Sequence, residues 1–337
     1  MKYISVIIPV LNATNTIERA LASLISNKDF IKEVIIIDDG TTDDTFDKIE
    51  IFKSFYEIKV IKNPGEKGPG PARRAGMLEA TGDWITFLDA DDCIIPSAFR
   101  YVTKEIFKCE DIKILYAKSI YYETGHFTSD TIHYSDNSCG GSFYLRDYLI
   151  DNNLLPHESL FMQEDMYFNG IIRIFMHDKG HSKDIYHFDY PTYEVHHDRD
   201  IEESFSSESW GRYLVKYQLI RQQYLTDFFK SNMQMRLRLK ESYIKNIIQA
   251  FFQMEGLMIT NDLQGEEFHS LARDFYNAVE YFKDTFFGTE QNIVEYFDKN
   301  PKIVQALFEE SFQGVGTEFQ GALSFPNFIL RLDRYMK

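Results

Sequence analysis

Three carboxylates crowd into one short stretch of the sequence, directly after the apolar run Trp84–Leu88. Asp89, Asp91 and Asp92 repel one another, and each resists leaving water. Two carboxylates one residue apart at the end of a strand can hold a hard divalent cation through oxygen. Such a cation bridges the phosphate oxygens of a nucleotide and stabilises the charge of a leaving diphosphate. A solvated turn is the alternative interpretation of this triplet when it is taken alone.

A second acidic pair, Asp38-Asp39, follows the apolar run Val34–Ile37, and Asn12 follows the run Val6–Val10. The segment Asp-Asp-Gly-Thr-Thr also suits a turn that caps a helix, which is the alternative interpretation of this pair. Acidic and amide groups that recur after apolar runs indicate a common edge of a sheet, where their side chains would meet a ligand.

The elements that would position these residues alternate between strand and helix signals. Capping residues precede the first two helical patterns, and Pro71 and Pro96 suit the first turns of the next two. This alternation predicts an α/β fold with a mostly parallel sheet, flanked by helices on both faces. In such sheets ligands bind at the carboxyl ends of the strands. The expected strands are Val6–Val10, Val34–Ile37, Ile58–Ile61, Trp84–Leu88 and Ile112–Tyr116.

The pattern changes beyond about Phe205, where strand signals fade and long amphipathic helical patterns dominate. We therefore expect two domains: residues 1–204 with the sheet, and a helical C-terminal region at 205–337. The helical region is the expected platform for acceptor binding or for homo-oligomerisation. Its clearest helical patterns are Tyr213–Phe229, Leu237–Met254 and Phe268–Phe287.

Composition and charge narrow the class of protein. The chain has 337 residues, is 44% hydrophobic and carries a formal net charge of −16, which disfavours binding to nucleic acid or to anionic membranes. No stretch approaches the roughly 20 apolar residues of a membrane span. The run Tyr3–Val10 follows the first residues directly, so we expect no signal peptide. Three cysteines without metal-type spacing fit a reducing compartment, and we expect a cytoplasmic protein.

Four ordered segments of the sequence resemble the family 2 glycosyltransferases with the GT-A fold. The resemblance covers Ser5–Pro96 closely and extends more loosely to about residue 205. It implies a nucleotide-diphospho-sugar donor, usually a UDP-sugar, a divalent metal (Mn²⁺ or Mg²⁺) and inversion at the anomeric carbon. The four segments are IIPVLNATNTIERALAS, EVIIIDDGTTDDT, GPARRAG and GDWITFLDADD.

The resemblance also implies roles for residues around the nucleoside. Pro9 and Asn12 match the wall of the nucleoside pocket. Either Asp38 or Asp39 would accept a hydrogen bond from N3–H of the base, as in the Asp-Asp-Gly-Ser segment of the family. Asn63 would also face the base, although the loop between it and the next motif is about two residues longer than usual.

The third and fourth segments would hold the sugar diphosphate. Arg73 matches the arginine of the Ala-Arg-Asn-x-Gly motif, which helps to hold the nucleotide; here Arg74 replaces the asparagine. A surface salt bridge on a helix is the alternative for Arg73. In the triplet Asp89-Ala90-Asp91, Asp89 matches a ligand of the donor sugar or ribose. Asp91, together with Asp89, matches the metal site.

An inverting transfer needs a base that takes the proton of the acceptor hydroxyl. Glu164-Asp165 resembles the Glu-Asp pair of the family, whose Asp is the base, so we expect Asp165 to be the base and Glu164 to orient it. An acidic pair at a helix N-terminus is the alternative. The resemblance also suggests His196 or His197 as a further metal ligand, against the alternative of ordinary surface or core histidines. More weakly, it places diphosphate-binding hydroxyls at Ser204, Ser206 and Ser207.

Motifs that are missing separate the remaining alternatives. The chain lacks the Gln-x-x-Arg-Trp signature of processive polysaccharide synthases, so we expect transfer of one sugar at a time. It also lacks a Gly-x-Gly-x-x-Gly segment after the first strand, which disfavours a dinucleotide oxidoreductase. A sugar nucleotidyltransferase would need a Gly-rich loop there, whereas Val10–Thr16 contains no glycine. A catalytically silent sugar-nucleotide-binding or scaffold domain stays open, as does a phosphate-rich polymer as acceptor.

Overall fold

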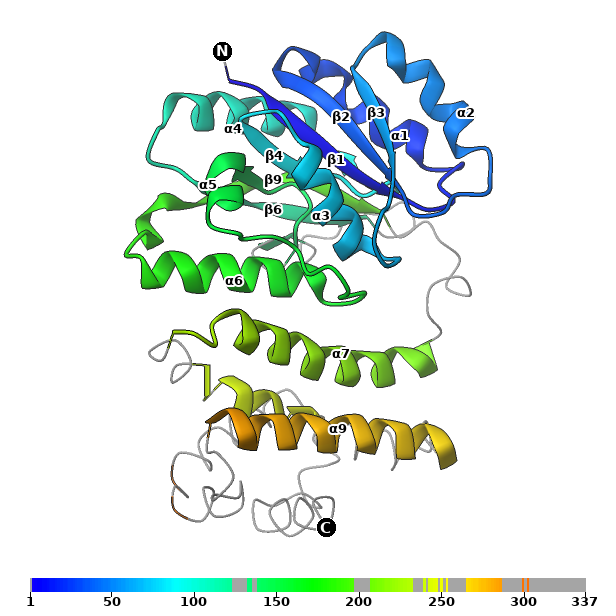
Figure 1. The fold of residues 1–337 in the computed structure, drawn as a ribbon. Helices are drawn as coiled ribbons and strands as arrows, with labels where there is room; N and C mark the ends of the chain where they lie inside the picture. Colours follow the sequence, from blue (N-terminus) through cyan, green and yellow to red (C-terminus); the bar gives the residue numbers. More distant parts are fainter. Residues whose placement is uncertain are drawn as a thin grey trace. The chain divides into compact units, whose positions relative to one another are not determined.

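The apolar runs of the N-terminal sequence form the parallel part of one sheet in a computed structural model of the protein (Figure 1). The structure describes residues 2–122, 132–134, 138–196 and 207–232, most positions from 239 to 250 with 253, then 265–286, 299 and 302. The chain divides into two units, Met1–Arg199 and Asp200–Lys337, and each is described by itself.

Four neighbouring strands of the first unit run parallel in the order β3-β2-β1-β4. Three of them, β1, β2 and β4, are almost continuously buried, which agrees with strands covered on both faces. Their carboxyl ends lie at the same edge of the sheet. The four strands are β1 (Ile4–Val10), β2 (Ile31–Asp38), β3 (Ile58–Lys62) and β4 (Trp84–Phe87).

The rest of the sheet mixes the two directions, in the continued order β4-β8-β6-β9-β5, with β7 on β6. Strand β8 is antiparallel to both β4 and β6, β9 is parallel to β6, and β5 is antiparallel to β9. The predicted α/β fold is confirmed, with an antiparallel strand inserted in the middle of the sheet. The added strands are β5 (Cys93–Ile94), β6 (Ile114–Tyr122), β7 (Ile132–Tyr134), β8 (Phe143–Leu145) and β9 (Ile185–His196).

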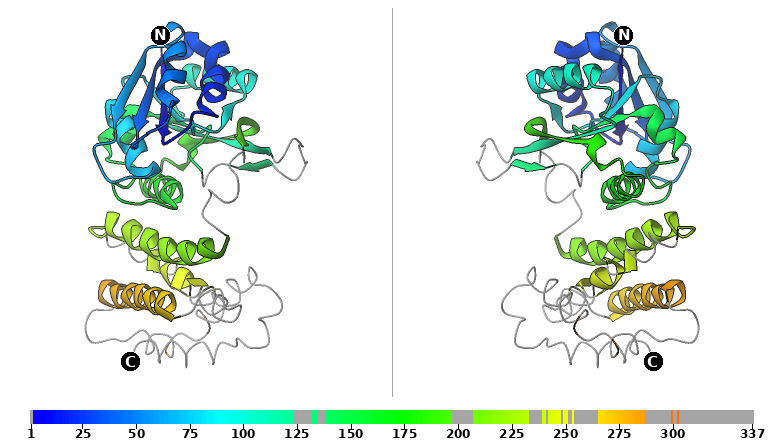
Figure 2. Two further views of the ribbon diagram at one scale, coloured as in Figure 1. Left: turned by 90° about the vertical axis from the view of Figure 1, so that its right-hand side faces the viewer. Right: turned by 90° about the vertical axis from the view of Figure 1, so that its left-hand side faces the viewer.

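Helices cover both faces of this sheet (Figures 1 and 2). Alternate residues of β1 point to opposite faces: Val6 and Ile8 join the core under α1 and α4, whereas Ile7 contacts Gly76 of α3. On the Ile7 face, Phe87 packs edge-on against Phe168 of α6. The helices are α1 (Ile17–Leu24), α2 (Thr45–Glu50), α3 (Pro69–Glu79), α4 (Pro96–Lys108), α5 (Arg146–Asp151) and α6 (Glu164–Asp178).

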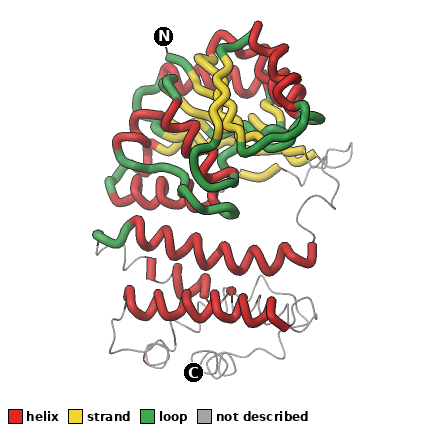
Figure 3. Tube along the Cα trace, turned by 45° about the vertical axis from the view of Figure 1, so that its right-hand side comes forward, coloured by secondary structure: helices red, strands yellow, loops and turns green. Residues whose placement is uncertain are grey.

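The second unit is helical in its described residues (Figure 3). Helices α7 (Ser207–Phe228) and α9 (Gly265–Phe286) match two predicted helices, and the third, Leu237–Met254, is only partly within the described residues. Tyr243 stacks on Phe282 with ring centroids 5.1 Å apart. Among the described helices, none combines the length and hydrophobicity needed to span a bilayer.

Candidate active site

The acidic stretch after β4 folds as a turn whose shape is fixed by hydrogen bonds to its backbone. The Asp92 N–H donates to the Asp89 carbonyl oxygen at 3.1 Å, and the Arg19 guanidinium donates to the Asp91 carbonyl oxygen at 2.5 Å. The Asp89 N–H donates to the hydroxyl of Tyr193 at 3.0 Å. Because Tyr193 belongs to β9, a strand from the far end of the unit holds the turn in place.

The three carboxylates of this turn differ in burial. Asp92 is buried, and its Oδ1 accepts the His196 N–H at 2.8 Å. Burial, with the adjacent charges of Asp89 and Asp91, raises the pKa of Asp92 from 3.8 to about 8. The Asp89 side chain is 38% exposed, and Asp91 is partly exposed. Asp92 therefore fastens the turn to β9, and Asp89 and Asp91 retain access to solvent.

Arg73 joins three motifs that are far apart in the sequence. It lies on α3 and is buried, with Nη2 2.7 Å from Asp89 Oδ1 and Nη1 2.5 Å from Glu164 Oε1. A buried guanidinium needs such partners, because an unpaired charge in the interior is very costly. Its burial rules out the surface salt bridge considered above. The neighbouring Arg74 donates instead to the carbonyl oxygen of Pro156 at 3.3 Å.

The acidic pair Glu164-Asp165 opens helix α6, directly after Gln163 in the left-handed region with φ 58°. Burial raises the pKa of Glu164, although Arg73 counteracts it. Burial and the charge of Glu164 raise the pKa of Asp165 from 3.8 to about 7, against the opposing effect of Arg73. The Asp165 Oδ1 accepts the Met166 N–H at 2.7 Å. Asp165 therefore changes charge near neutral pH.

The two carboxylates at the end of β2, Asp38 and Asp39, have different hydrogen-bond partners. Oδ1 of Asp38 accepts the N–H groups of Gly40 at 3.0 Å and Thr41 at 2.8 Å, so this side chain closes the turn. Asp39 is buried; Asn63 donates to its Oδ1 at 2.6 Å, and the Gly68 N–H donates to its Oδ2 at 2.8 Å. The structure thus brings Asp39 and Asn63 together, and their predicted roles at the base stay predictions.

Asn12 lies at the end of β1 beside this turn. Its backbone takes the left-handed conformation with φ 50°, which asparagine tolerates better than most residues. Its Oδ1 accepts the Thr42 N–H at 2.9 Å, and its own N–H donates to Thr41 Oγ1 at 3.4 Å. Pro9 pairs with Ile37 in the β1–β2 ladder. The ends of β1 and β2 are therefore tied together around the predicted nucleoside pocket.

His196 lies in a cluster that the sequence did not suggest. Cys93 and Glu194 face each other across the β5–β9 ladder, and His196 is two residues further along β9, on the same face. The ligand atoms of these three side chains lie within 4.8 Å of one another. The His196 Nε2 is 3.4 Å from Glu194 Oε2. His197, Ser204 and Ser206 lie outside the described residues.

Sequence reasoning missed Tyr193, Glu194 and Cys93 as neighbours of the site. The strand signal was available, since YPTYEVH is rich in aromatic and β-branched residues. The pairing with β5 was not, because it joins two-residue segments about 100 positions apart, Cys93–Ile94 and Tyr193–Glu194. The described site thus combines carboxylates, an arginine and amides at one edge of the sheet.

Comparisons with known proteins point to one family. The sequence pattern of the family described as Glycosyl transferase family 2 matches residues 5–167. The chain is 35% identical over 122 residues to the Escherichia coli protein UDP-Glc:alpha-D-GlcNAc-diphosphoundecaprenol beta-1,3-glucosyltransferase WfaP, covering 36% of this chain and 47% of that protein. It is 29% identical over 195 residues to the minor teichoic acid biosynthesis protein GgaA of Bacillus subtilis (strain 168). This match covers 50% of this chain and 43% of GgaA.

The fold is also similar to that of S. aureus TarS, residues 1–349, in complex with UDP-GlcNAc. The TM-score is 0.58 at 16% identity, and the match covers 96% of this chain and 93% of that one. Residues 5–167 match the pattern of glycosyl transferase family 2, and this match confirms the resemblance seen in the sequence. The matches to WfaP and GgaA each span less than half of the relative.

Proposed function

We propose that this protein transfers one sugar at a time from a nucleotide-diphospho-sugar to an acceptor hydroxyl, with inversion at the anomeric carbon. The observation that carries this proposal is the Arg73 ion triad, which brings Asp89 beside the Glu164-Asp165 pair. The donor-side motif and the predicted base thereby share one site. The acceptor that we propose is a glycan or another hydroxyl compound; the name of WfaP gives a GlcNAc-diphosphoundecaprenol, and that of GgaA gives teichoic acid biosynthesis.

A UDP-sugar is the donor we assign. Asp39 is the better of the two candidates for the N3–H of the base, since Oδ1 of Asp38 already closes its own turn. Asp39 accepts two hydrogen bonds, and a carboxylate has about four acceptor positions, so it retains capacity for a base. The solved TarS complexes with UDP and UDP-GlcNAc support the same choice.

A divalent cation, Mn²⁺ or Mg²⁺, fits the chemistry of the Asp89–Asp91 turn. Both side chains are accessible oxygen donors on one turn, which is what hard cations prefer. Asp91, with Asp89, would hold the cation, and His196 is the nearest described imidazole on the strand that fastens this turn. When bound, the cation neutralises the charge that grows on the leaving diphosphate.

Asp165 is the proposed base. The acceptor oxygen forms a bond to the anomeric carbon while the bond from that carbon to the diphosphate breaks. The diphosphate leaves with the electron pair, and the Asp165 carboxylate takes the proton of the acceptor hydroxyl. A base whose pKa lies near 7 suits proton transfer at neutral pH. Glu164, bound to Arg73, orients the start of α6.

Two further elements of this proposal concern the setting of the reaction. The three cysteines, Cys93, Cys109 and Cys139, are free thiols, which supports a reducing compartment such as the cytoplasm. The helices of the second unit are the proposed platform for the acceptor or for a second copy of the chain.

Thermal shift with UDP, GDP, CDP and TDP, each with and without Mn²⁺, tests the proposal. A ligand at about 100 times its Kd stabilises the folded state by roughly 2.7 kcal/mol. We expect a Mn²⁺-dependent shift with UDP that Asp91→Ala abolishes. Asp29→Ala, a change at an exposed carboxylate in the 3-10 helix Ile25–Phe30, should preserve it. An active Asp91→Ala enzyme would remove the metal assignment. Binding of UDP-sugar without any turnover would favour the silent-domain alternative.

A further inference from the structure

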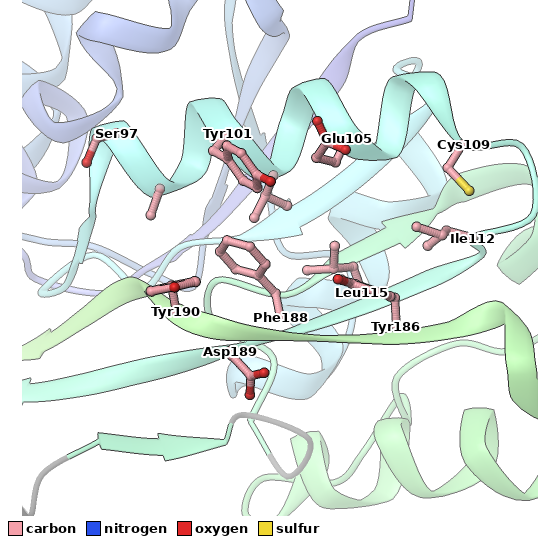
Figure 4. Close-up of a pocket in the computed structure, with 12 residues that line it drawn as sticks. Ser97, Tyr101, Glu105, Cys109, Ile112, Leu115, Tyr186, Phe188, Asp189 and Tyr190 are labelled. Carbon is pink, nitrogen blue, oxygen red and sulfur yellow. The ribbon is translucent and has the colours of Figure 1, made fainter.

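A cavity lies between α4 and the first half of β9, and none of the site residues described above lines it (Figure 4). Its volume is about 610 Å³, within the range of pockets that bind small molecules. Figure 4 shows Tyr101 and Glu105 on the helix above and Phe188 reaching from the strand towards the Tyr101 ring. We call this cavity the α4–β9 groove.

Exposed aromatic rings distinguish the α4–β9 groove from an ordinary surface hollow. Tyr101, Tyr186 and Tyr190 are 56%, 49% and 68% exposed. Tyr101 stacks on Phe188, with ring centroids 5.6 Å apart and the rings inclined by 23°. The ring centroids of Phe188 and Tyr190 are 5.5 Å apart. Large rings usually contribute to the core, so three exposed tyrosines along one groove offer aromatic faces to a ligand.

The rings form a row because of the local secondary structure. Residues 186 and 188 alternate along β9 and therefore share one face. The pairing of β9 is irregular after Phe188, and Tyr190 lines the same groove. Positions 101 and 105 lie one turn apart on α4. Tyr186 lies opposite Leu115 of β6, and Pro191, next to Tyr190, lies opposite Lys118, so the row extends over at most three β6 residues, roughly 10 Å. This length suits an extended ligand with several rings rather than a single small ring.

The charge of the α4–β9 groove selects among such ligands. Among the described residues that line it, none is a lysine or an arginine and two, Glu105 and Asp189, are carboxylates, so the groove disfavours anionic groups such as phosphate and carboxylate. The carboxylate of Glu105, 46% exposed, is bound to Lys108 at 3.0 Å and keeps positions that accept hydrogen bonds from hydroxyl groups. Tyrosine hydroxyls complete a rim that can both donate and accept.

We propose that the α4–β9 groove binds a neutral oligosaccharide. The C–H faces of successive pyranose rings would pack on Tyr101, Tyr186 and Tyr190, while their hydroxyls bond to Glu105 and to the tyrosine hydroxyls. This inference rests on the proposed function in one respect: the ligand is assigned as a distal part of the glycan acceptor.

Position separates the α4–β9 groove from the candidate active site. Phe188 lines the groove, whereas Tyr193, five residues further along β9, contacts the acidic turn. Between them β9 departs from regular pairing: Phe188 lies opposite Ala117 of β6 and Tyr193 lies opposite Ser119, so the advance along the sheet is that of two β6 residues, about 7 Å. Binding in the groove would raise the effective concentration of a long acceptor near the candidate active site. A short acceptor, which cannot reach both places, would not be concentrated in this way.

Calorimetric titration of the full chain, without nucleotide or metal, tests this inference. The probes are chitotetraose and maltotetraose, which are neutral, and tetragalacturonic acid, which is anionic. We expect a neutral tetrasaccharide to bind, and Tyr186→Ala and Tyr190→Ala each to weaken its binding about tenfold. The control Phe55→Ala removes a ring that is 41% exposed on another surface and should leave the affinity unchanged.

Several results would overturn the inference: no binding of either neutral probe, equal binding of the anionic probe, or equal loss in Phe55→Ala. A dimer in sedimentation velocity that Tyr190→Ala dissociates would assign the groove to a second copy of the chain instead. Parallel assays of sugar transfer keep the two proposals apart. Sugar transfer without tetrasaccharide binding would contradict only the proposal for the groove. Tetrasaccharide binding without sugar transfer would contradict only the catalytic proposal.

Discussion

At the scale of single residues, the site depends on one buried cation shared by two carboxylates. Arg73 holds Asp89, 16 positions away in sequence, and Glu164, 91 positions away. Breaking a buried pair by removing one partner typically costs about 3–5 kcal/mol, because the other charge is left unpaired. Substitutions within this triad therefore change folding and catalysis together. Substitutions of residues next to the triad separate the two effects better.

Asp165→Asn is such a test, since it keeps the shape of the side chain and removes the base. We expect UDP binding to stay within about twofold and the rate of transfer to fall by about 10²–10⁴-fold. In the unchanged protein the carboxylate is protonated below pH 7 and free above it, so the rate should rise with pH through about 7. Asp151→Asn, at an exposed carboxylate of α5, serves as control. Near-normal transfer by Asp165→Asn would remove this residue as the base.

Tyr193→Phe probes the support of the acidic turn. The hydroxyl accepts the Asp89 N–H at 3.0 Å and donates to the Asp92 carboxylate, so its loss removes one hydrogen bond from each of these groups, while Asp92 still accepts the His196 N–H. We expect a loss of about 1–3 kcal/mol in the free energy of unfolding, measured in urea. The apparent Kd for Mn²⁺ with UDP should also rise, because the turn loses its fixed shape. A change in stability alone would limit Tyr193 to a structural role.

At the scale of elements, the position of Arg73 depends on how closely α3 approaches β1. A Cβ added at Gly76 would lie 2.3 Å from Ile7 Cγ2, far inside contact distance. Gly76→Ala should therefore displace the helix and destabilise the fold by about 1–3 kcal/mol, as overpacking does. In Gly65→Ala the nearest atoms to the new Cβ are 3.7 Å away, and we expect a change within about 0.5 kcal/mol. Urea denaturation compares the two variants, and equal stability would contradict this account of the α3 contact.

The parts of the fold that the sequence predicted are those encoded by local patterns. Apolar runs gave β1 to β4, and prolines marked the starts of α3 and α4. The inserted β8 was not expected, because three residues carry too little periodicity to distinguish a strand from a loop. Within the site, motif residues such as Asp39 and Asn63 were predicted, whereas Tyr193 and Cys93 depend on pairing between distant segments.

At the scale of the whole molecule, the first unit contains the described residues of the proposed site. A fragment of residues 1–199 keeps the sheet, its helices and the Arg73 triad. We expect this fragment to show the same Mn²⁺-dependent shift with UDP as the full chain. If acceptor binding depends on the second unit, the fragment should bind UDP and fail to transfer sugar. Loss of the UDP shift in a folded fragment would show that the nucleotide site needs residues beyond 199.

The pairing of β5 with β9 also has a consequence for the order in which this protein acquires its structure. Strands β1 to β4 lie within the first 87 residues, so they can associate after short loops close. The acidic turn is held by Tyr193, His196 and the Ile95 N–H bond to the Thr192 carbonyl, all separated from their partners by about 100 residues. Closing longer loops costs more chain entropy and slows folding. We therefore expect a refolding chain to gain its hydrophobic sheet early and its catalytic competence late.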